Sequence, residues 1–201
     1  MKKYIAEFFG TFVLTLVVAL SLSGRFSVPT PVLAGLTLAL FVYTIGDVSG
    51  SHINPAVTIG LWFMGKIKQK EAINYLFAQF LGAGIAHIIV LLLKGWGSFA
   101  VVQDTLTGGI VVGFAETIGM IIFTFGIAAV IYGKVSNVLS GFIIGGSLFI
   151  GITVATLFGS NGVLNPAVAL GIGSFNFMYL VGPILGSYLG MNLYKKLLKK
   201  E

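Results

Sequence analysis

The tripeptide Asn-Pro-Ala occurs twice, at corresponding places in the two halves of the chain, as Asn54-Pro55-Ala56 and as Asn165-Pro166-Ala167. Asn is a favoured N-cap and Pro a favoured first helical residue, so each motif predicts the start of a helix. Glycines or lysines follow soon, so we expect the helices to end near Met64 and near Gly173. A helix of ten residues covers roughly half of the ~30 Å hydrocarbon core of a bilayer.

The rest of the chain is apolar enough to lie in a membrane. Only 9% of its residues are charged and 57% are hydrophobic, whereas a soluble domain has about 25% charged residues. There are no cysteines, so thiol chemistry and disulfides are excluded. The apolar segments predict six membrane-spanning helices, at 4–22, 32–46, 72–93, 110–132, 139–157 and 175–194, with a polar, glycine-rich connection at 95–109 that holds Gln103 and Asp104.

The two halves are repeats of one another. The segment that begins Ala-Glu-Phe-Phe-Gly at residue 6 matches the one that begins Ala-Glu-Thr-Ile-Gly at residue 115. Glu7 and Glu116 are 109 residues apart, and the two motif asparagines are 111 apart. Each half holds three spans, an odd number, so the second half must cross in the opposite sense. The chain is therefore predicted to be one channel domain, 1–201, with inverted repeats at about 1–94 and 110–201.

The positive charge predicts an orientation in the membrane, not a nucleic-acid partner. Ten of the twelve basic residues lie in four short clusters between or outside the spans, and only Arg25 and Lys94 do not. With both chain termini in the cytoplasm all four clusters are cytoplasmic, as the positive-inside rule favours. The clusters are Lys2 and Lys3; Lys66, Lys68 and Lys70; Lys134; and Lys195, Lys196, Lys199 and Lys200.

In an inverted repeat the two half-helices enter from opposite faces and meet with their N-termini at the midplane. Each N-terminus carries about half a positive charge and unsatisfied N–H groups, which should repel protons and cations. Asn54 and Asn165 would cap the helices and present their amides to the lumen. Non-helical backbone is tolerated at this depth only where it lines a cavity or is buried, so we expect lining by the preceding loops, at Gly50, Ser51, His52, Ser160 and Asn161.

Further short motifs are spread over the whole chain: residues 6–11, residues 49–58, Ala78-Gln79 with Gly82-Ala83, and Gly182-Pro183 with Gly186. Together with Glu116 and both Asn-Pro-Ala motifs, they resemble the aquaporin and glycerol-facilitator (major intrinsic protein) family. The resemblance implies an all-α membrane fold of six transmembrane helices plus two half-helices, and a homotetramer with one pore per subunit. It also implies that Glu7 and Glu116 accept hydrogen bonds from the loop backbone; a proton-coupling role is the alternative reading of these carboxylates.

The chain departs from this family at the outer selectivity filter. Members usually carry an arginine directly after the second Asn-Pro-Ala, where this chain has Val168. By ungapped matching the filter set becomes Ala34, Thr153, Gly162 and Val168, which is small, neutral and nearly apolar. Because pore diameter and lining donors set selectivity, we expect water and small neutral solutes such as glycerol or urea to pass. A water-only pore, an ammonia-type pore and a mouth closed by dewetting remain alternatives.

Other residues allow competing readings. Asp47 either lies in the cytoplasmic vestibule or caps a helix end, and His52 either bonds within its own loop or acts as a pH gate. His87 is expected to serve helix packing. We expect no metal site and no cofactor, and the loops show no catalytic constellation, which argues against an enzyme. A coupled secondary transporter is the alternative of a different class. The expected location is a prokaryotic plasma membrane.

Overall fold

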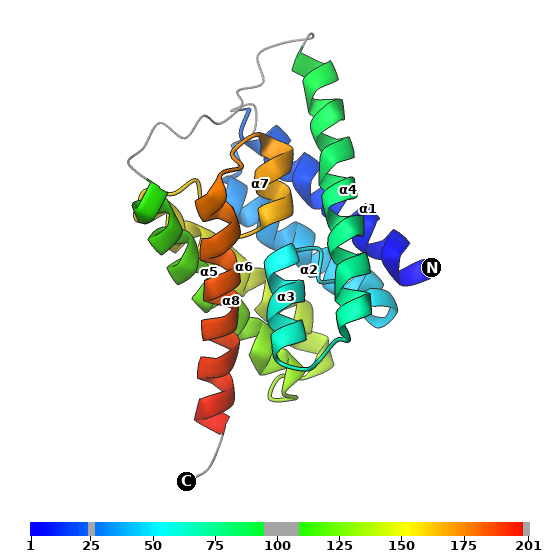
Figure 1. The fold of residues 1–201 in the computed structure, drawn as a ribbon, viewed down its shortest axis with the longest axis vertical. Helices are drawn as coiled ribbons and strands as arrows, with labels where there is room; N and C mark the ends of the chain where they lie inside the picture. The colour runs from blue at the N-terminus through cyan, green and yellow to red at the C-terminus, as the bar shows by residue number, and fades with distance from the viewer. Residues whose placement is uncertain (24–26, 95–108, 199–201) are drawn as a thin grey trace.

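The computed structural model describes residues 1–23, 27–94 and 109–198, and these ranges contain helices but no strand. The predicted connection with Gln103 and Asp104, and the basic residues Arg25, Lys199 and Lys200, lie outside them. Figure 1 shows the helices in chain order: α1 (Lys2–Ser21), α2 (Thr30–Ser49), α3 (Pro55–Phe63), α4 (Gln69–Lys94), α5 (Gly109–Ile131), α6 (Ser140–Leu157) preceded by the 3-10 turn η1 (Asn137–Leu139), α7 (Pro166–Ile172) and α8 (Phe177–Leu198).

Five of these helices are both long enough and apolar enough to cross a bilayer: α1, α2, α4, α5 and α6, the last counted from Asn137. The sixth predicted span, α8, has 22 residues and so reaches about 33 Å. Glycine, serine, tyrosine and asparagine interrupt its leucines. The all-helical membrane fold predicted from the sequence is confirmed, with the spans shifted by a few residues at their ends.

The two half-helices begin where the repeated motifs predict. Asn54 and Asn165 are the N-caps of α3 and α7, with proline at the first helical position of each. The helices contain 9 and 7 residues, about 13 and 10 Å of rise. Gly173 is the C-cap of α7 and has φ 79°, a left-handed conformation that glycine adopts without strain. In Figure 1, α7 lies above α3 along the middle of the molecule.

Packing interlocks the two repeats. Within the first repeat α1 packs against α2 and α4, and within the second α5 packs against α6 and α8, while α2 packs against α6 across the repeats. Each half-helix contacts the opposite repeat, because α3 packs on α8 and α7 packs on α1 and α4. Glycines permit the closest approaches: a Cβ added to Gly119 or Gly151 would lie 2.5 Å from the carbonyl oxygen of the other. Neither helix could carry a side chain there without moving apart.

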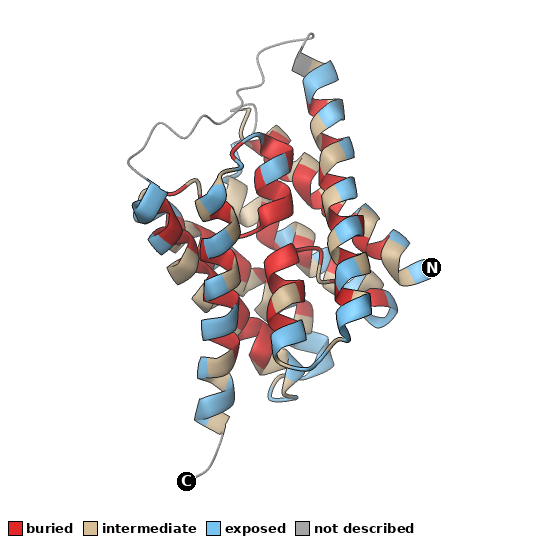
Figure 2. Ribbon diagram, in the orientation of Figure 1, coloured by how far each residue is buried: buried red, intermediate tan, exposed pale blue. Residues whose placement is uncertain are grey.

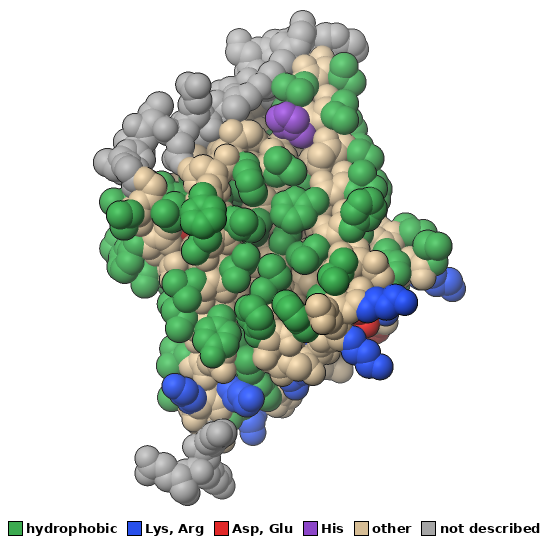
Figure 3. Space-filling model, viewed as in Figure 1, with side chains coloured by type: hydrophobic (Ala, Val, Ile, Leu, Met, Phe, Trp, Pro, Cys, Tyr) green, Lys and Arg blue, Asp and Glu red, His purple; other side chains and the backbone are tan. Residues whose placement is uncertain are grey.

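The distribution of polar and apolar groups is that of a membrane protein. Large apolar side chains are highly exposed, for example Phe77 at 72% and Phe142 at 71%, whereas Glu7, Gln79 and Glu116 are fully buried. Figure 2 shows buried residues concentrated along the central axis, and Figure 3 shows that apolar side chains cover most of this face, with lysines gathered toward one end. An apolar surface, with the polar and charged side chains of the spans buried inside, suits a solvent of lipid.

Candidate functional site

A buried carboxylate holds the loop before α3. Oε1 of Glu7 accepts from the Ser49 hydroxyl at 2.7 Å and from the His52 amide at 2.9 Å. Oε2 accepts from the Ile53 amide at 2.6 Å and from Nε2 of Gln79 at 2.8 Å. The four donors saturate the lone pairs of a carboxylate. Glu7 on α1 therefore holds the non-helical loop before α3 in place through hydrogen bonds.

Glu116 repeats this arrangement on α5. It accepts from the Ser160 hydroxyl, from the Val163 amide at 2.9 Å and from the Leu164 amide at 2.6 Å. These three donors lie 111 residues after Ser49, His52 and Ile53, the same offset that separates the two motif asparagines. Ser160 was predicted to line the pore, but neither serine was predicted to bond a glutamate; their equal distance before each Asn-Pro-Ala is the signal that identifies this role.

The two asparagines join the repeats at the centre of the molecule. Nδ2 of Asn54 donates to the Leu164 carbonyl at 2.8 Å, and Nδ2 of Asn165 donates to the Ile53 carbonyl at 2.9 Å. Each Oδ1 accepts from its own helix, from Ala56 at 2.9 Å and from Ala167 at 3.1 Å. Because an amide NH₂ has two hydrogens, each asparagine keeps one donor beyond this bridge.

The loops hold their backbone in a strained conformation. Ile53 and Leu164 have φ values of 37° and 51°, a region that non-glycine residues rarely occupy and that costs about 1–3 kcal/mol each. Both residues are fully buried, and the amide of each donates to a glutamate. The strain turns their carbonyls toward the opposite asparagine, so the glutamates and asparagines together fix the conformation.

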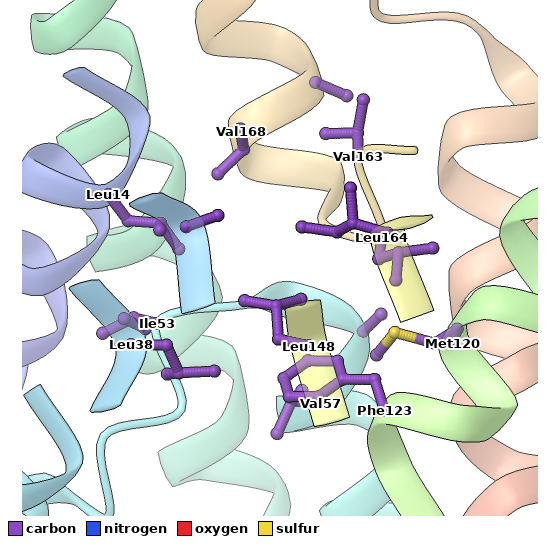
Figure 4. Close-up of a cluster of buried hydrophobic side chains, with 14 of the residues drawn as sticks. Leu14, Leu38, Ile53, Val57, Met120, Phe123, Leu148, Val163, Leu164 and Val168 are labelled. Carbon is purple, nitrogen blue, oxygen red and sulfur yellow. The ribbon is translucent and has the colours of Figure 1, made fainter. Parts of the chain in front are cut away.

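A mostly apolar cavity of about 240 Å³ opens beside Val168, and we call it the Val168 cavity. Its walls come from α1, α2, α5, α6 and α7, and Figure 4 shows labelled members of this wall and the surrounding core, among them Leu14, Leu38, Leu148 and Val168. Asn54 and Asn165 supply two of its polar groups. The volume is several times the ~30 Å³ that one water molecule occupies in the liquid.

Three of the four predicted filter residues line the Val168 cavity: Ala34, Gly162 and Val168. Thr153 does not. The lining residues of α6 are Leu148, Ile152 and Thr156, spaced four apart along one face. Because successive helical residues are rotated by about 100°, matching one position too far along the chain turns the side chain off the lumen. The filter role of Thr153 stays a prediction; the nearest member of the lining stripe is Ile152.

A second cavity of about 530 Å³ lies on the side of Asp47, and we call it the Asp47 cavity. It shares Leu38, His52 and Phe123 with the Val168 cavity, so the two lie end to end and meet at these side chains. Asp47 and Lys66 stand in its wall. The vestibule position that we considered for Asp47 is the one found, and the two cavities together trace a path past the half-helix N-termini.

The remaining predicted residues divide by role. Gly50, Ser51 and His52 line the Asp47 cavity and Asn161 lines the Val168 cavity, whereas Ser160 lines neither and instead bonds Glu116. Pro55, Ala56, Pro166 and Ala167 are buried outside both linings and shape the helix starts. His52 bonds within its own segment, to Thr58 at 3.1 Å, and His87 bonds the Gly171 carbonyl of α7 at 2.9 Å. Over the described ranges no group of side chains has a metal-binding arrangement.

Fold and site define a helical membrane channel built from inverted repeats around two half-helices. A family model described as "Major intrinsic protein" matches residues 1–194, and the chain belongs to this family. Aquaporin AqpM of Methanothermobacter marburgensis is 31% identical over 98% of this chain and 97% of its own length. The "Probable glycerol uptake facilitator protein" of Thermotoga maritima is 30% identical over 96% and 98%.

A solved structure is similar over the same extent. The X-ray structure of the aquaglyceroporin from Plasmodium falciparum has a TM-score of 0.78 and 25% identity, and the match covers 98% of this chain and 96% of that one. The family and these relatives make the protein a passive transmembrane channel for water and small solutes.

Proposed function

We propose that this channel conducts uncharged solutes of the size of glycerol or urea as well as water. The observation that carries the proposal is Val168, which is 2% exposed and lines the cavity at the position where the resemblance to the family places an arginine. An arginine would add five N–H donors and a fixed charge. Valine supplies neither, so size and the apolar wall set the selectivity at this level of the pore.

The proposed outer constriction consists of Ala34, Ile152, Gly162 and Val168. Three of these side chains are apolar and the fourth residue has none, so hydrogen bonds to a permeating solute come from loop carbonyls and from the asparagines. The proposed central constriction is formed by Asn54 and Asn165 with the helix starts behind them. Protons and cations are excluded at that level by the two half-helix N-termini, each equivalent to about half a positive charge.

The decisive experiment is stopped-flow light scattering on proteoliposomes, with water and glycerol measured on the same preparation. Wild type is expected to conduct both. Val168→Arg should lose glycerol flux and retain water flux, whereas Val168→Leu, which adds bulk without charge, should retain part of the glycerol flux. Fast water flow without glycerol flow in wild type would overturn the proposal. Equal thermal stability of the variants excludes misfolding as the cause.

A second candidate permeant is ammonia, and the apolar stripe of α6 favours it. Leu148 and Ile152 face the same lumen as Leu14, Leu38 and Val168, and such a wall offers few partners to a solute with several hydroxyls. If this candidate is correct, an inward ammonia gradient should change the internal pH of proteoliposomes faster than in empty vesicles, while glycerol flux stays at the level of the lipid. Ammonia and glycerol flux together would indicate a pore selective by size alone.

The assembly and location that we infer are a homotetramer, one pore per subunit, in a prokaryotic plasma membrane with both termini in the cytoplasm. Support for the orientation comes from Lys2, Lys3, Lys195 and Lys196, which lie at the ends of α1 and α8, and from the positive-inside rule. Passive conduction through a pore requires no catalytic step, and we propose that the protein acts without a cofactor. Cross-linking of purified protein and labelling of an engineered terminal cysteine would test these points.

A further inference from the structure

The lipid-facing surface between α1 and α4 carries a groove that is not part of the pore. The two helices are in close contact at Gly82, where an added Cβ would clash with the carbonyl oxygen of Phe8. Nearer their N-termini a space of about 320 Å³ opens between them. Its walls are formed by Tyr4, Ile5, Phe8, Asn74, Phe77, Ala78 and Leu81.

The chemistry of the groove changes in order along its length. Lys70, Asn74, Ala78 and Leu81 follow one another at spacings of four, four and three residues, which places them on one face of α4. The stripe therefore begins with a cation, continues with an amide and ends in apolar side chains. On α1 the order is the same, from Lys2 and Lys3 through the Tyr4 hydroxyl to Phe8.

The polar part of the groove, formed by Tyr4 and Asn74, has hydrogen-bond donors that no protein group in the described part of the chain uses. Nδ2 of Asn74 donates to the Tyr4 hydroxyl at 3.2 Å, which uses one of the two amide hydrogens and leaves the Tyr4 O–H group able to donate. Lys3 pairs with Glu71 beside it. Lys2 and Lys70 are exposed and form no ion pair with any described residue, so an excess of positive charge remains at this end of the groove.

We propose that the groove binds one anionic glycerophospholipid from the lysine-rich leaflet. Its phosphate lies beside Lys2 and Lys70, its ester carbonyls accept from Tyr4 and Asn74, and an acyl chain lies along Phe8, Phe77 and Leu81. The seven helical steps from Asn74 to Leu81 rise about 10 Å, a third of the ~30 Å hydrocarbon core, which matches the upper part of one acyl chain. Charge complementarity separates this occupant from a zwitterionic lipid.

The corresponding place in the second repeat is filled by protein. A Cβ added to Gly113, the counterpart of Tyr4 on α5, would lie 2.9 Å from Sδ of Met178, and Gly109 also faces Met178. The methionine side chain thus occupies the space between α5 and α8 that stays open between α1 and α4. Within this chain the site is therefore specific to the first repeat.

The test is native mass spectrometry of the detergent-purified channel with phosphatidylglycerol or phosphatidylcholine of identical acyl chains. Wild type is expected to bind phosphatidylglycerol more tightly. The double variant Lys2→Gln, Lys70→Gln should lower that affinity by about fivefold for each lysine. The matched control, Lys195→Gln with Lys196→Gln, removes equal charge from the last turn of α8 and should leave the affinity unchanged.

A second pair of variants tests the apolar part of the groove, where the acyl chain is proposed to lie. Ile5→Trp places bulk in the groove, and Ile73→Trp makes the same change at an equally exposed site outside it; the two isoleucines are 60% and 56% exposed. Only Ile5→Trp should weaken binding. Three results would overturn the proposal. The first is an equal loss of phosphatidylglycerol affinity in both lysine double variants, and the second is no preference for phosphatidylglycerol in wild type. The third is a changed number of subunits in Ile5→Trp alone. The last result would mean that a second copy of the chain covers the groove.

Discussion

Replacing Glu7 by glutamine tests whether the carboxylate is an anchor for the pore loop. Glutamine keeps one acceptor oxygen and turns the other into an NH₂ group. Whichever way the amide is oriented, it faces one backbone amide that now lacks an acceptor, either that of His52 or that of Ile53. One buried unsatisfied N–H costs about 1–3 kcal/mol, and the bonds that remain lose their charge assistance.

Together these effects are expected to destabilise the protein by about 2–4 kcal/mol, which for a chain of this length lowers the Tm by about 5–15 °C. The loop would also lose the contact that holds Ile53 at positive φ, so its carbonyl would no longer be fixed for Asn165. Flux of water should therefore fall along with stability. Thermal unfolding in detergent and stopped-flow scattering measure the two effects.

The control is Asp47→Asn, the same acid-to-amide change at an exposed carboxylate, which should leave the Tm within about 1 °C of wild type because surface substitutions cost little. A Glu7→Gln protein as stable and as conductive as wild type would refute the anchor. A stable Glu7→Gln protein that had lost a response to a pH gradient would instead support proton coupling, the alternative reading of this residue.

Two further predictions concern the constrictions. Gly162→Ala should reduce solute flux and destabilise the protein by about 1–3 kcal/mol, because Gly162 has φ 62° and its Cβ would lie 2.7 Å from the Ile152 carbonyl oxygen. The control Gly84→Ala, on α4 with open space around it, should neither reduce flux nor destabilise the protein. Asn165→Ala should destabilise by about 1–2 kcal/mol through the lost cap and admit small cations, because the bridge to Ile53 is lost; unfolding and vesicle conductance measure both.

Helix positions followed from the sequence because local chemistry sets them. An Asn-Pro pair before an apolar stretch starts a helix whatever surrounds it, and α3 and α7 begin as predicted. The inverted order followed from counting three spans per half. Long apolar stretches located α1, α2, α4, α5 and α6, with errors of a few residues where a helix extends beyond its apolar part, as α4 does at Gln69.

The site was less predictable, since it depends on contacts between distant parts of the chain. Thr153 was assigned by ungapped matching to the family, and such matching does not reveal which face of α6 meets the lumen. The bridge between the asparagine amides and the opposite loops needs coordinates from both repeats. Val168 and Gly162 adjoin a motif whose backbone is fixed by its own caps, and both line the Val168 cavity; their role in a filter stays a prediction.

The hydrogen bonds between the two asparagines and the opposite loops can form only late in synthesis, because they join distant parts of the chain. Asn54 and its acceptor Leu164 are 110 residues apart, and chain elongation proceeds at about 5–20 residues per second. The first loop therefore spends about 5–20 s in the membrane before its partner exists. During that interval the Ile53 carbonyl has no amide to accept from, and the nascent first repeat depends on water or on the insertion machinery to shield it.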